Sequence, residues 1–206
     1  MSIRVQSTTV RVEADENLQR HIQVSNSRGY LVISTDRDRC LRSSNPIAVH
    51  ITTPNLEKIR LAGSGNIDCG AFDTPDMEVE LDGSGNIYID RLITDHAEFT
   101  IDGSGYIESE VDAFSVESTI EGSGEIRLFG VTDVADMLIT GSGRIRANEM
   151  DANDCYATIT GSGDIYTFVF DLLDATISGS GSVYYYGNPS QVVKRISGSG
   201  NVIRRN

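Results

Sequence analysis

A serine flanked by two glycines is the pattern in this sequence with the most obvious capacity for chemistry. The triplet Gly-Ser-Gly begins at eight places, which are Gly63, Gly83, Gly103, Gly122, Gly141, Gly161, Gly179 and Gly198. Such a serine could act as a nucleophile beside a general base, and a glycine-rich loop could hold a phosphate.

Both kinds of chemistry need other spacings. A nucleophile elbow reads Gly-x-Ser-x-Gly, and phosphate loops read Gly-x-x-x-x-Gly-Lys or Gly-x-Gly-x-x-Gly before a helix. Neither spacing occurs, and the three histidines, His21, His50 and His96, cannot serve eight equivalent serines. The triplet therefore indicates a turn, in which glycine supplies a positive φ and room for a close neighbour.

Carboxylates recur at two fixed offsets from this turn. One place before the first glycine the residues are Ala62, Asp82, Asp102, Glu121, Thr140 and Thr160, and five places before it they are Lys58, Glu78, Glu98, Glu117 and Asp136. On parallel strands about 4.8 Å apart they would form two acidic ladders on one face, whose like charges raise one another's pKa. Hard cations accept such oxygens, so Asp82, Asp102 and Glu121 form a hypothetical calcium site with an affinity of the order of millimolar. The alternative is a solvated acidic face, and the aspartate of the calcium-binding nonapeptide appears at its offset only as Asp68.

An acidic stripe could also belong to a carbohydrate-active enzyme, either a polysaccharide lyase or a hydrolase. General acid and base catalysis needs two carboxylates in different environments, one of them with a raised pKa. A regular ladder does not resemble such a pair, and 18 to 20 residues per repeat leave little chain to wall a cleft. We therefore expect no catalysis and keep this enzyme class as the alternative.

Aromatic side chains form a third candidate, near the end of the chain. Tyr166 and Tyr184 lie five residues after the first glycine of their triplets, and Phe168 and Tyr186 lie seven residues after it. If both offsets face solvent, the four rings form a ligand-binding patch two repeats high, which can stack on sugar rings or fill a partner's pocket. The alternative is that one of these columns turns inward or packs under the following loop.

The elements that position these side chains follow from the period. The triplets are 20, 20, 19, 19, 20, 18 and 19 residues apart, with an aliphatic residue two places before each first glycine and four places after it. Apolar and charged residues alternate around the turn, as in Met77, Val79 and Leu81, which predicts strands with one buried face. Units this short bury that face only by stacking, so the sequence predicts an all-β, single-stranded parallel β-helix with coils of about 19 residues. A leucine-rich repeat needs a different consensus, and a propeller blade is about twice as long.

Domain organisation and composition extend this prediction. Residues 59–206 carry the eight marked coils, and we expect residues 1–58 to form irregular first coils and a cap within the same domain. The net charge of −13 argues against nucleic acid or an anionic membrane as a partner, because both are negatively charged. No apolar run reaches transmembrane length, and the opening residues do not form a signal peptide. Cys69 and Cys155 occupy apolar positions of the repeat and are expected to be buried, whereas the state of Cys40 stays open.

The repeat units GSGNI, GSGDI and GSGSV, the upstream HITTPNLEKIRLAGSG and the closing VYYYGNPS together resemble the bacterial head GIN domain family, described as a "putative auto-transporter adhesin". The resemblance implies a right-handed β-helix located outside the cytoplasm, and the family offers no catalytic residues to carry over. It favours a non-catalytic, extracytoplasmic binding or scaffolding module, an adhesin at the cell envelope. The partner implied is a cell-surface glycan or an envelope protein, no cofactor is expected beyond weakly bound calcium, and self-association stays open.

Overall fold

The computed structural model describes residues 8–27, 29–35 and 46–206, and Cys40 lies outside them. The chain divides into two compact units, Met1–Pro54 and Asn55–Asn206. Each unit has its own strand pattern.

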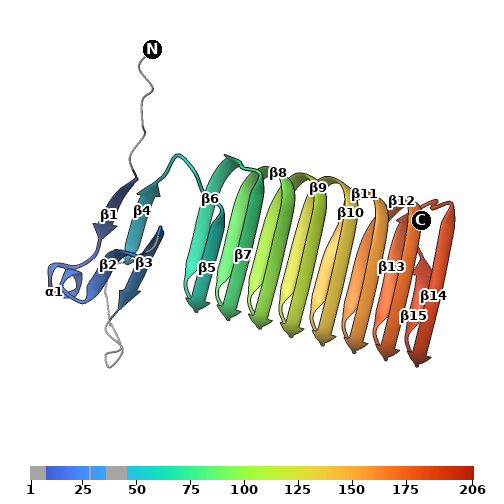
Figure 1. Ribbon diagram of the computed structural model, residues 1–206. Helices are drawn as coiled ribbons and strands as arrows, with labels where there is room; N and C mark the ends of the chain where they lie inside the picture. The colour runs from blue at the N-terminus through green and yellow to red at the C-terminus, as the bar shows by residue number, and fades with distance from the viewer. Residues whose placement is uncertain (1–7, 28, 36–45) are drawn as a thin grey trace, which may run out of the picture. The chain divides into compact units, whose positions relative to one another are not determined.

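The first unit is built from short antiparallel pairs. Its elements are β1 (Thr9–Glu13), α1 (Glu16–Gln19), β2 (Ile22–Ser27), β3 (Tyr30–Thr35) and β4 (Ala48–Thr52) (Figure 1). β1 pairs with β4 and β2 pairs with β3, both antiparallel, whereas the coils of a parallel β-helix pair in parallel. The role of this unit as a cap stays a prediction.

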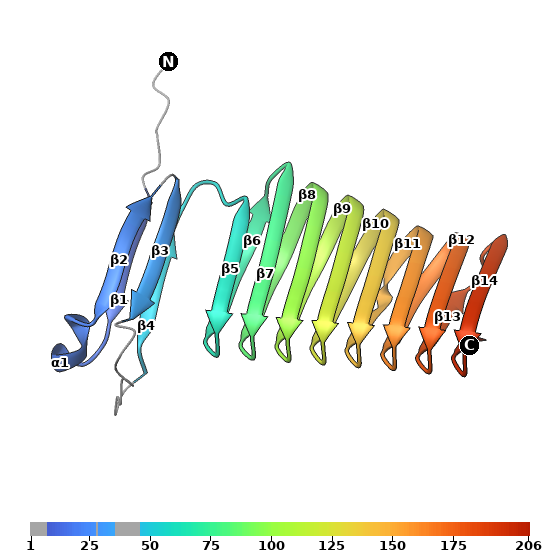
Figure 2. The ribbon, with the colours of Figure 1, turned by 60° about the horizontal axis from the view of Figure 1, so that its bottom comes forward.

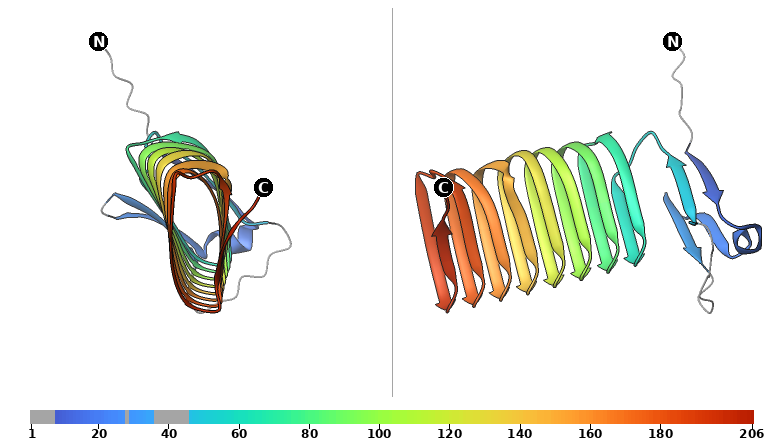
Figure 3. Two further views of the ribbon diagram at one scale, coloured as in Figure 1. Left: turned by 90° about the vertical axis from the view of Figure 1, so that its right-hand side faces the viewer. Right: turned by 180° about the vertical axis from the view of Figure 1, so that it is seen from behind.

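The second unit is a β-solenoid of about eight coils, each of about 19 residues, as the period predicts. Its strands are β5 (Lys58–Gly63), β6 (Asn66–Asp73), β7 (Asp76–Gly83), β8 (Asn86–Gly103), β9 (Tyr106–Gly122), β10 (Glu125–Gly141), β11 (Arg144–Gly161), β12 (Asp164–Gly179), β13 (Ser182–Gly187), β14 (Gln191–Gly198) and β15 (Asn201–Arg204). Each long strand from β8 to β12 runs from one Gly-Ser-Gly turn to the next and bends halfway. Viewed along the stack, the coils form a flattened ring (Figure 3).

All strand pairs of the solenoid are parallel and keep the turns in register. Gly83 is aligned with Gly103, which is aligned with Gly122, and this alignment continues to Gly198. Figure 2 shows the turns as a row of small loops beyond the arrowheads along one edge. A residue at a given offset from the turn therefore lies beside the residues at that offset in the neighbouring coils.

The geometry of the turn explains why both glycines are needed. Gly103 has a φ of +128°, and a Cβ added there would lie 2.4 Å from the carbonyl oxygen of Gly83 in the preceding coil. A Cβ at Gly105 would lie 2.3 Å from a methyl group of Leu81. The close approach permits a backbone bond, because the amide of Ser104 donates to the Gly83 oxygen at 2.9 Å. The triplet is thus accounted for by coil stacking.

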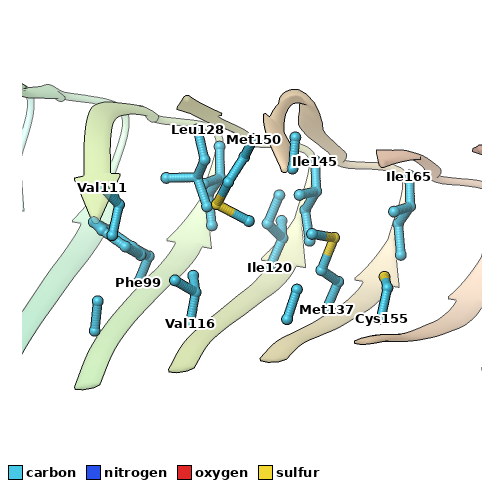
Figure 4. Packing of buried hydrophobic residues seen from close by; sticks show 14 of the residues in the cluster. Phe99, Val111, Val116, Ile120, Leu128, Met137, Ile145, Met150, Cys155 and Ile165 are labelled. Carbon is cyan, nitrogen blue, oxygen red and sulfur yellow. The ribbon is translucent and has the colours of Figure 1, made fainter. Parts of the chain in front are cut away.

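The core lies inside the coils and consists of the inward columns that the alternation predicts. Ile101, Ile120 and Ile139, two residues before their turns, are fully buried, as are Ile107 and Ile126, four residues after theirs. Figure 4 shows Phe99, Ile120, Met137 and Ile145 pointing into this space. Large and small residues alternate in one inward column, where Phe99 is followed by Ser118 and Met137 and then by Ala157. Neighbouring coils therefore fill each other's gaps, as close packing requires.

Two cysteines pack with the core. Cys155 is completely buried among apolar side chains, and burial raises the pKa of its thiol to about 12. Cys69 lies on the first coil and is only partly buried, and desolvation raises the pKa of its thiol to about 11. Both thiols are protonated at neutral pH and contribute as small hydrophobic groups.

The last coil breaks the inward pattern. Lys194 is aligned with the buried Ala175, and Arg204 is aligned with the buried Tyr185, so two basic residues occupy inward positions. The ammonium group of Lys194 donates to the carbonyl oxygen of Val202 at 3.0 Å and lies 5.9 Å from the centre of the Tyr185 ring. The lysine thus crosses from β14 to β15 over the end of the apolar core.

Candidate functional site

Two outer faces of the solenoid flank the Gly-Ser-Gly turns. We call the outward side chains one, three and five residues before the first glycine the upstream face, and those three, five and seven residues after it the downstream face. Both faces display their columns in the register described above, so each column is a row of side chains on neighbouring coils.

The acidic ladders lie on the upstream face, where their offsets place them. Glu78, Glu98, Glu117 and Asp136 are successive partners in the register. The first coil neutralises the start of this ladder, because the Lys58 ammonium lies 2.6 Å from Glu78 and 2.9 Å from Glu80. These contacts raise the pKa of Lys58, with the hydrogen bond to Glu78 as the largest cause.

Further along, the ladder lacks such compensation. Within the described part of the chain, no basic side chain pairs with Glu98, Glu117 or Asp136. Desolvation by burial raises the pKa of Asp136, and the negative charge of Glu117 adds to the effect. The like charge of Glu117 thus contributes to the raised pKa of Asp136, after burial.

The proposed calcium ligands lie side by side but do not form a closed site. Asp82 is aligned with Asp102, and Asp102 with Glu121, and all three side chains are exposed. Asp82 is also 3.9 Å from the guanidinium of Arg60. Among the described residues no group of three or more His, Cys, Asp or Glu side chains is arranged to hold a metal ion. Calcium binding at this ladder stays a prediction.

The aromatic residues lie together on the downstream face. Tyr166 is aligned with Tyr184, and Phe168 with Tyr186. All four alternate with fully buried neighbours such as Ile165 and Val183, and all four are partly exposed. Neither column turns inward, so we call these four residues the aromatic patch.

Two arginines complete a stack within this patch. The rings of Tyr166 and Tyr184 are stacked, with centroids 4.8 Å apart and planes 17° apart. The guanidinium of Arg146 lies 5.2 Å from the Tyr166 centroid, and that of Arg205 lies 4.9 Å from the Tyr184 centroid. The order Arg146, Tyr166, Tyr184, Arg205 therefore follows the axis of the solenoid.

This stack changes what the tyrosines can offer to a ligand. The two ring faces turned toward each other are covered, and the other two are covered by guanidinium groups. Tyr166 and Tyr184 therefore present ring edges and hydroxyl groups. Phe168 contacts Phe170 edge to face, with centroids 5.2 Å apart, and Tyr186 has no ring partner among the described residues. Phe168 and Tyr186 are partly exposed and carry no stacked guanidinium among the described residues, so they are the candidates for stacking on a sugar.

The two arginines differ in their charge environment. The Nε of Arg146 donates to Glu125 at 2.9 Å, so the charge of Arg146 is paired. Arg205 has no carboxylate partner among the described residues of a chain that holds 30 acidic residues. Its amide donates to the carbonyl oxygen of Tyr185 at 2.8 Å, which fixes its backbone beside the patch. An unpaired cation thus borders the aromatic patch.

Neither arginine was among the site residues predicted from the sequence, although the period of the repeat indicates both positions. Arg146 lies five residues after Gly141, which is the column of Tyr166 and Tyr184. Arg205 lies seven residues after Gly198, which is the offset of Phe168 and Tyr186. Extending the aromatic columns by one coil in each direction would have included them.

A shallow groove adjoins the patch at the bend of the coils. Its volume is about 300 Å³, and its polar lining includes Asp112, Asp133, Asp151 and Asn153. The Asn153 amide donates to Asp133 at 2.7 Å. Phe170 lines the groove and touches Phe168 of the patch, so the groove and the patch form one surface. Carboxylate and amide oxygens in such a groove can accept hydrogen bonds from hydroxyl groups of a ligand.

The chain matches a protein-family model along most of its length. A family model described as "Putative auto-transporter adhesin, head GIN domain" matches residues 3–113 and 89–189. Comparison with curated proteins finds none that matches. Within the described residues, no helix is both long and apolar enough to cross a membrane.

Solved structures that are similar to this chain include the following three. A protein named "putative lipid binding protein" from Parabacteroides distasonis ATCC 8503 is 27% identical, with a TM-score of 0.92 over 98% of this chain and 85% of that one. A "putative adhesin" from Parabacteroides merdae ATCC 43184 is 22% identical, with a TM-score of 0.92 over 97% and 84%. A "putative adhesin" from Bacteroides fragilis NCTC 9343 is 24% identical, with a TM-score of 0.73 over 97% and 83%. The last two support the fold alone.

Proposed function

The chain belongs to the family described as "Putative auto-transporter adhesin, head GIN domain", and we propose that it is a non-catalytic adhesin-like module that binds cell-surface glycans through the aromatic patch of its downstream face and the groove beside this patch. The binding surface consists of the aromatic patch and the adjoining groove. The family description supports a location at the cell envelope, outside the cytoplasm.

One observation carries this proposal, and it is the contact between Phe168 and Phe170. Through this contact the partly exposed rings of Phe168 and Tyr186 adjoin a groove whose lining includes Asp133, Asp151 and Asn153. A pyranose ring has an apolar face that packs on an aromatic ring and hydroxyl groups that donate to carboxylate or amide oxygens. The surface offers both kinds of contact side by side. An envelope protein would use the same rings as anchors in a pocket.

A glycan screen of the purified chain tests the proposal. We expect oligosaccharide binding that falls at least about tenfold in Phe168→Ala and in Tyr186→Ala, since each loses a stacking face. Tyr156→Ala is the matched control, because Tyr156 is 40% exposed but lies on the upstream face. Equal losses in all three variants, or no glycan binding at all, would contradict the proposal.

The alternative enzyme function is tested on the same samples. Turnover of acidic polysaccharides that disappears in Asp136→Asn would favour a carbohydrate-active enzyme, because Asp136 has a raised pKa beside the carboxylate of Glu117. We expect no turnover in the parent chain. Immunolabelling of intact cells of the source organism tests the location, with surface labelling as the expected result.

A further inference from the structure

Arg205 has the geometry of an anion-binding group at the edge of the aromatic patch. Its guanidinium lies 4.9 Å from the Tyr184 centroid, and its backbone is held by the bond from its amide to Tyr185. A guanidinium that is stacked and has its backbone fixed loses less side-chain entropy when it binds a ligand than a free one does. Arg205 is therefore placed to bind an anionic group.

The charge of Arg205 is not used within the described part of the chain. Every other guanidinium on the downstream face pairs with a carboxylate there: Arg127 with Glu149 at 3.1 Å, Arg144 with Glu125 at 3.5 Å and Arg146 with Glu125 at 2.9 Å. Arg205 instead lies on a tyrosine ring and remains exposed. Its five N–H donors are therefore available to a ligand beside Tyr184 and Tyr186.

We propose that the glycan bound at the aromatic patch carries a carboxylate, as a terminal uronic acid does, and that Arg205 binds this carboxylate. The inference rests on the proposed function and names the class of its ligand. A guanidinium binds a carboxylate through two parallel hydrogen bonds, and the hydroxyl groups of Tyr166 and Tyr184 add donors in the same row. The sugar ring then lies over Tyr186 or Phe168.

The acidic groove beside the aromatic patch disfavours a ligand that carries many negative charges. The groove beyond Phe170 holds Asp112, Asp133 and Asp151, and the chain as a whole has a net charge of −13. A polymer with a carboxylate on every sugar would place some of these charges against the groove, at a cost in repulsion. A glycan with one acidic sugar at its end and neutral sugars toward the groove avoids this repulsion. The same net charge disfavours a surface of anionic lipids.

The test compares two trisaccharides that differ in one group. One ends in galacturonic acid and the other ends in galactose, and their affinities for the full chain are measured by titration calorimetry. We expect the acidic trisaccharide to bind at least about tenfold more tightly than the neutral one. In Arg205→Gln the two affinities become equal, because the group that distinguishes the carboxylate from the neutral sugar is lost, and the stacking on Tyr184 that is lost with it affects both trisaccharides alike. The preference also weakens with salt.

Arg204→Gln is the matched control. It removes the same charge one residue away, at a position aligned with the buried Tyr185 and not with the patch. The preference should survive this change, and melting curves of both variants establish that they are folded. If Arg204→Gln removed the preference as fully as Arg205→Gln does, a general charge effect would replace the proposed contact.

Three other outcomes would overturn the inference. If the parent chain bound both trisaccharides equally, the proposed preference for a carboxylate would be wrong, whereas glycan binding at the patch would still hold. If the chain bound neither trisaccharide and no glycan in the screen, both the carboxylate inference and the proposed function would be wrong. Binding to vesicles of anionic phospholipid that is lost in Arg205→Gln would assign the arginine to a lipid headgroup.

Discussion

The inside and the outside of the same strands follow different rules. Four residues after each turn's first glycine, the inward column is aliphatic in every coil from Ile67 to Val202. One residue further, the outward column changes character from coil to coil and reads Asp68, Tyr88, Glu108, Arg127, Arg146, Tyr166, Tyr184 and Ile203. Stacking constrains the inside at every coil, whereas solvent constrains the outside little. The outward residues that differ from coil to coil are therefore the candidates for functional residues.

The largest effect should come from charging the inside. Ile107→Lys or Ile126→Lys should destabilise the fold by at least about 4 kcal/mol, because the side chain is fully buried between coils and a buried ammonium has no partner there. Glu108→Lys, one position outward, should cost much less, about 1 kcal/mol, because it removes partly exposed contacts with Tyr106 and Arg127. Denaturant unfolding of the three variants measures this. Similar stabilities for Ile107→Lys and Glu108→Lys would refute the inward assignment.

The turn gives a second contrast, between adjacent residues. Gly103→Ala should cost about 2 to 4 kcal/mol, since φ is +128° and the new Cβ would meet the Gly83 oxygen at 2.4 Å. Ser104→Ala should cost about 0.5 kcal/mol or less, because the bond to the preceding coil comes from the amide. Thermal melts compare them. A folded Ser104→Ala variant that had lost a specific activity would restore the serine as a nucleophile.

The inward residues could be predicted from the sequence, whereas the arrangement of the outward side chains could be predicted only in part. A strict period and an alternation of apolar residues predict the coils and the inward isoleucines. They leave open whether the columns of Tyr166 and Phe168 both face outward, which the structure shows. The covering of two ring faces by Arg146 and Arg205 depends on rotamers, which a pattern of residue types does not encode. The groove depends on the bend of the long strands, which no motif marks. The antiparallel pairs of the first unit were missed because that segment has no repeat.

The last coil carries charged residues at inward positions, and these charges are expected to oppose self-association through this end of the solenoid. Lys194 and Arg204 are charged at inward positions, and inward charges on an edge oppose pairing with another edge. Lys194→Ile should therefore increase self-association at high concentration relative to the parent chain. Arg195→Gln, an outward change on the same strand, should not do so. Sedimentation velocity distinguishes them, and identical distributions for all three proteins would show that Lys194 does not guard this end.

The smallest effect is expected on the upstream face. Calcium at millimolar concentration should raise the melting temperature by about 1 to 3 °C through neighbours such as Asp82, Asp102 and Glu121, and magnesium should raise it less. The difference should disappear in Asp102→Asn at matched ionic strength. If calcium, magnesium and sodium shift the parent and the variant equally, the ladders act only as a solvated acidic face whose charge is screened by salt.

The most direct test of the account is to map where a glycan binds. Backbone amide shifts of the isotope-labelled chain would be followed during titration with the trisaccharide that ends in galacturonic acid. We expect the largest shifts to cluster at residues 165–170, 184–187 and 203–205, around the aromatic patch and Arg205. Shifts that cluster instead at residues 78–82, 98–102 and 117–121 would place the binding surface on the acidic upstream face and contradict the account.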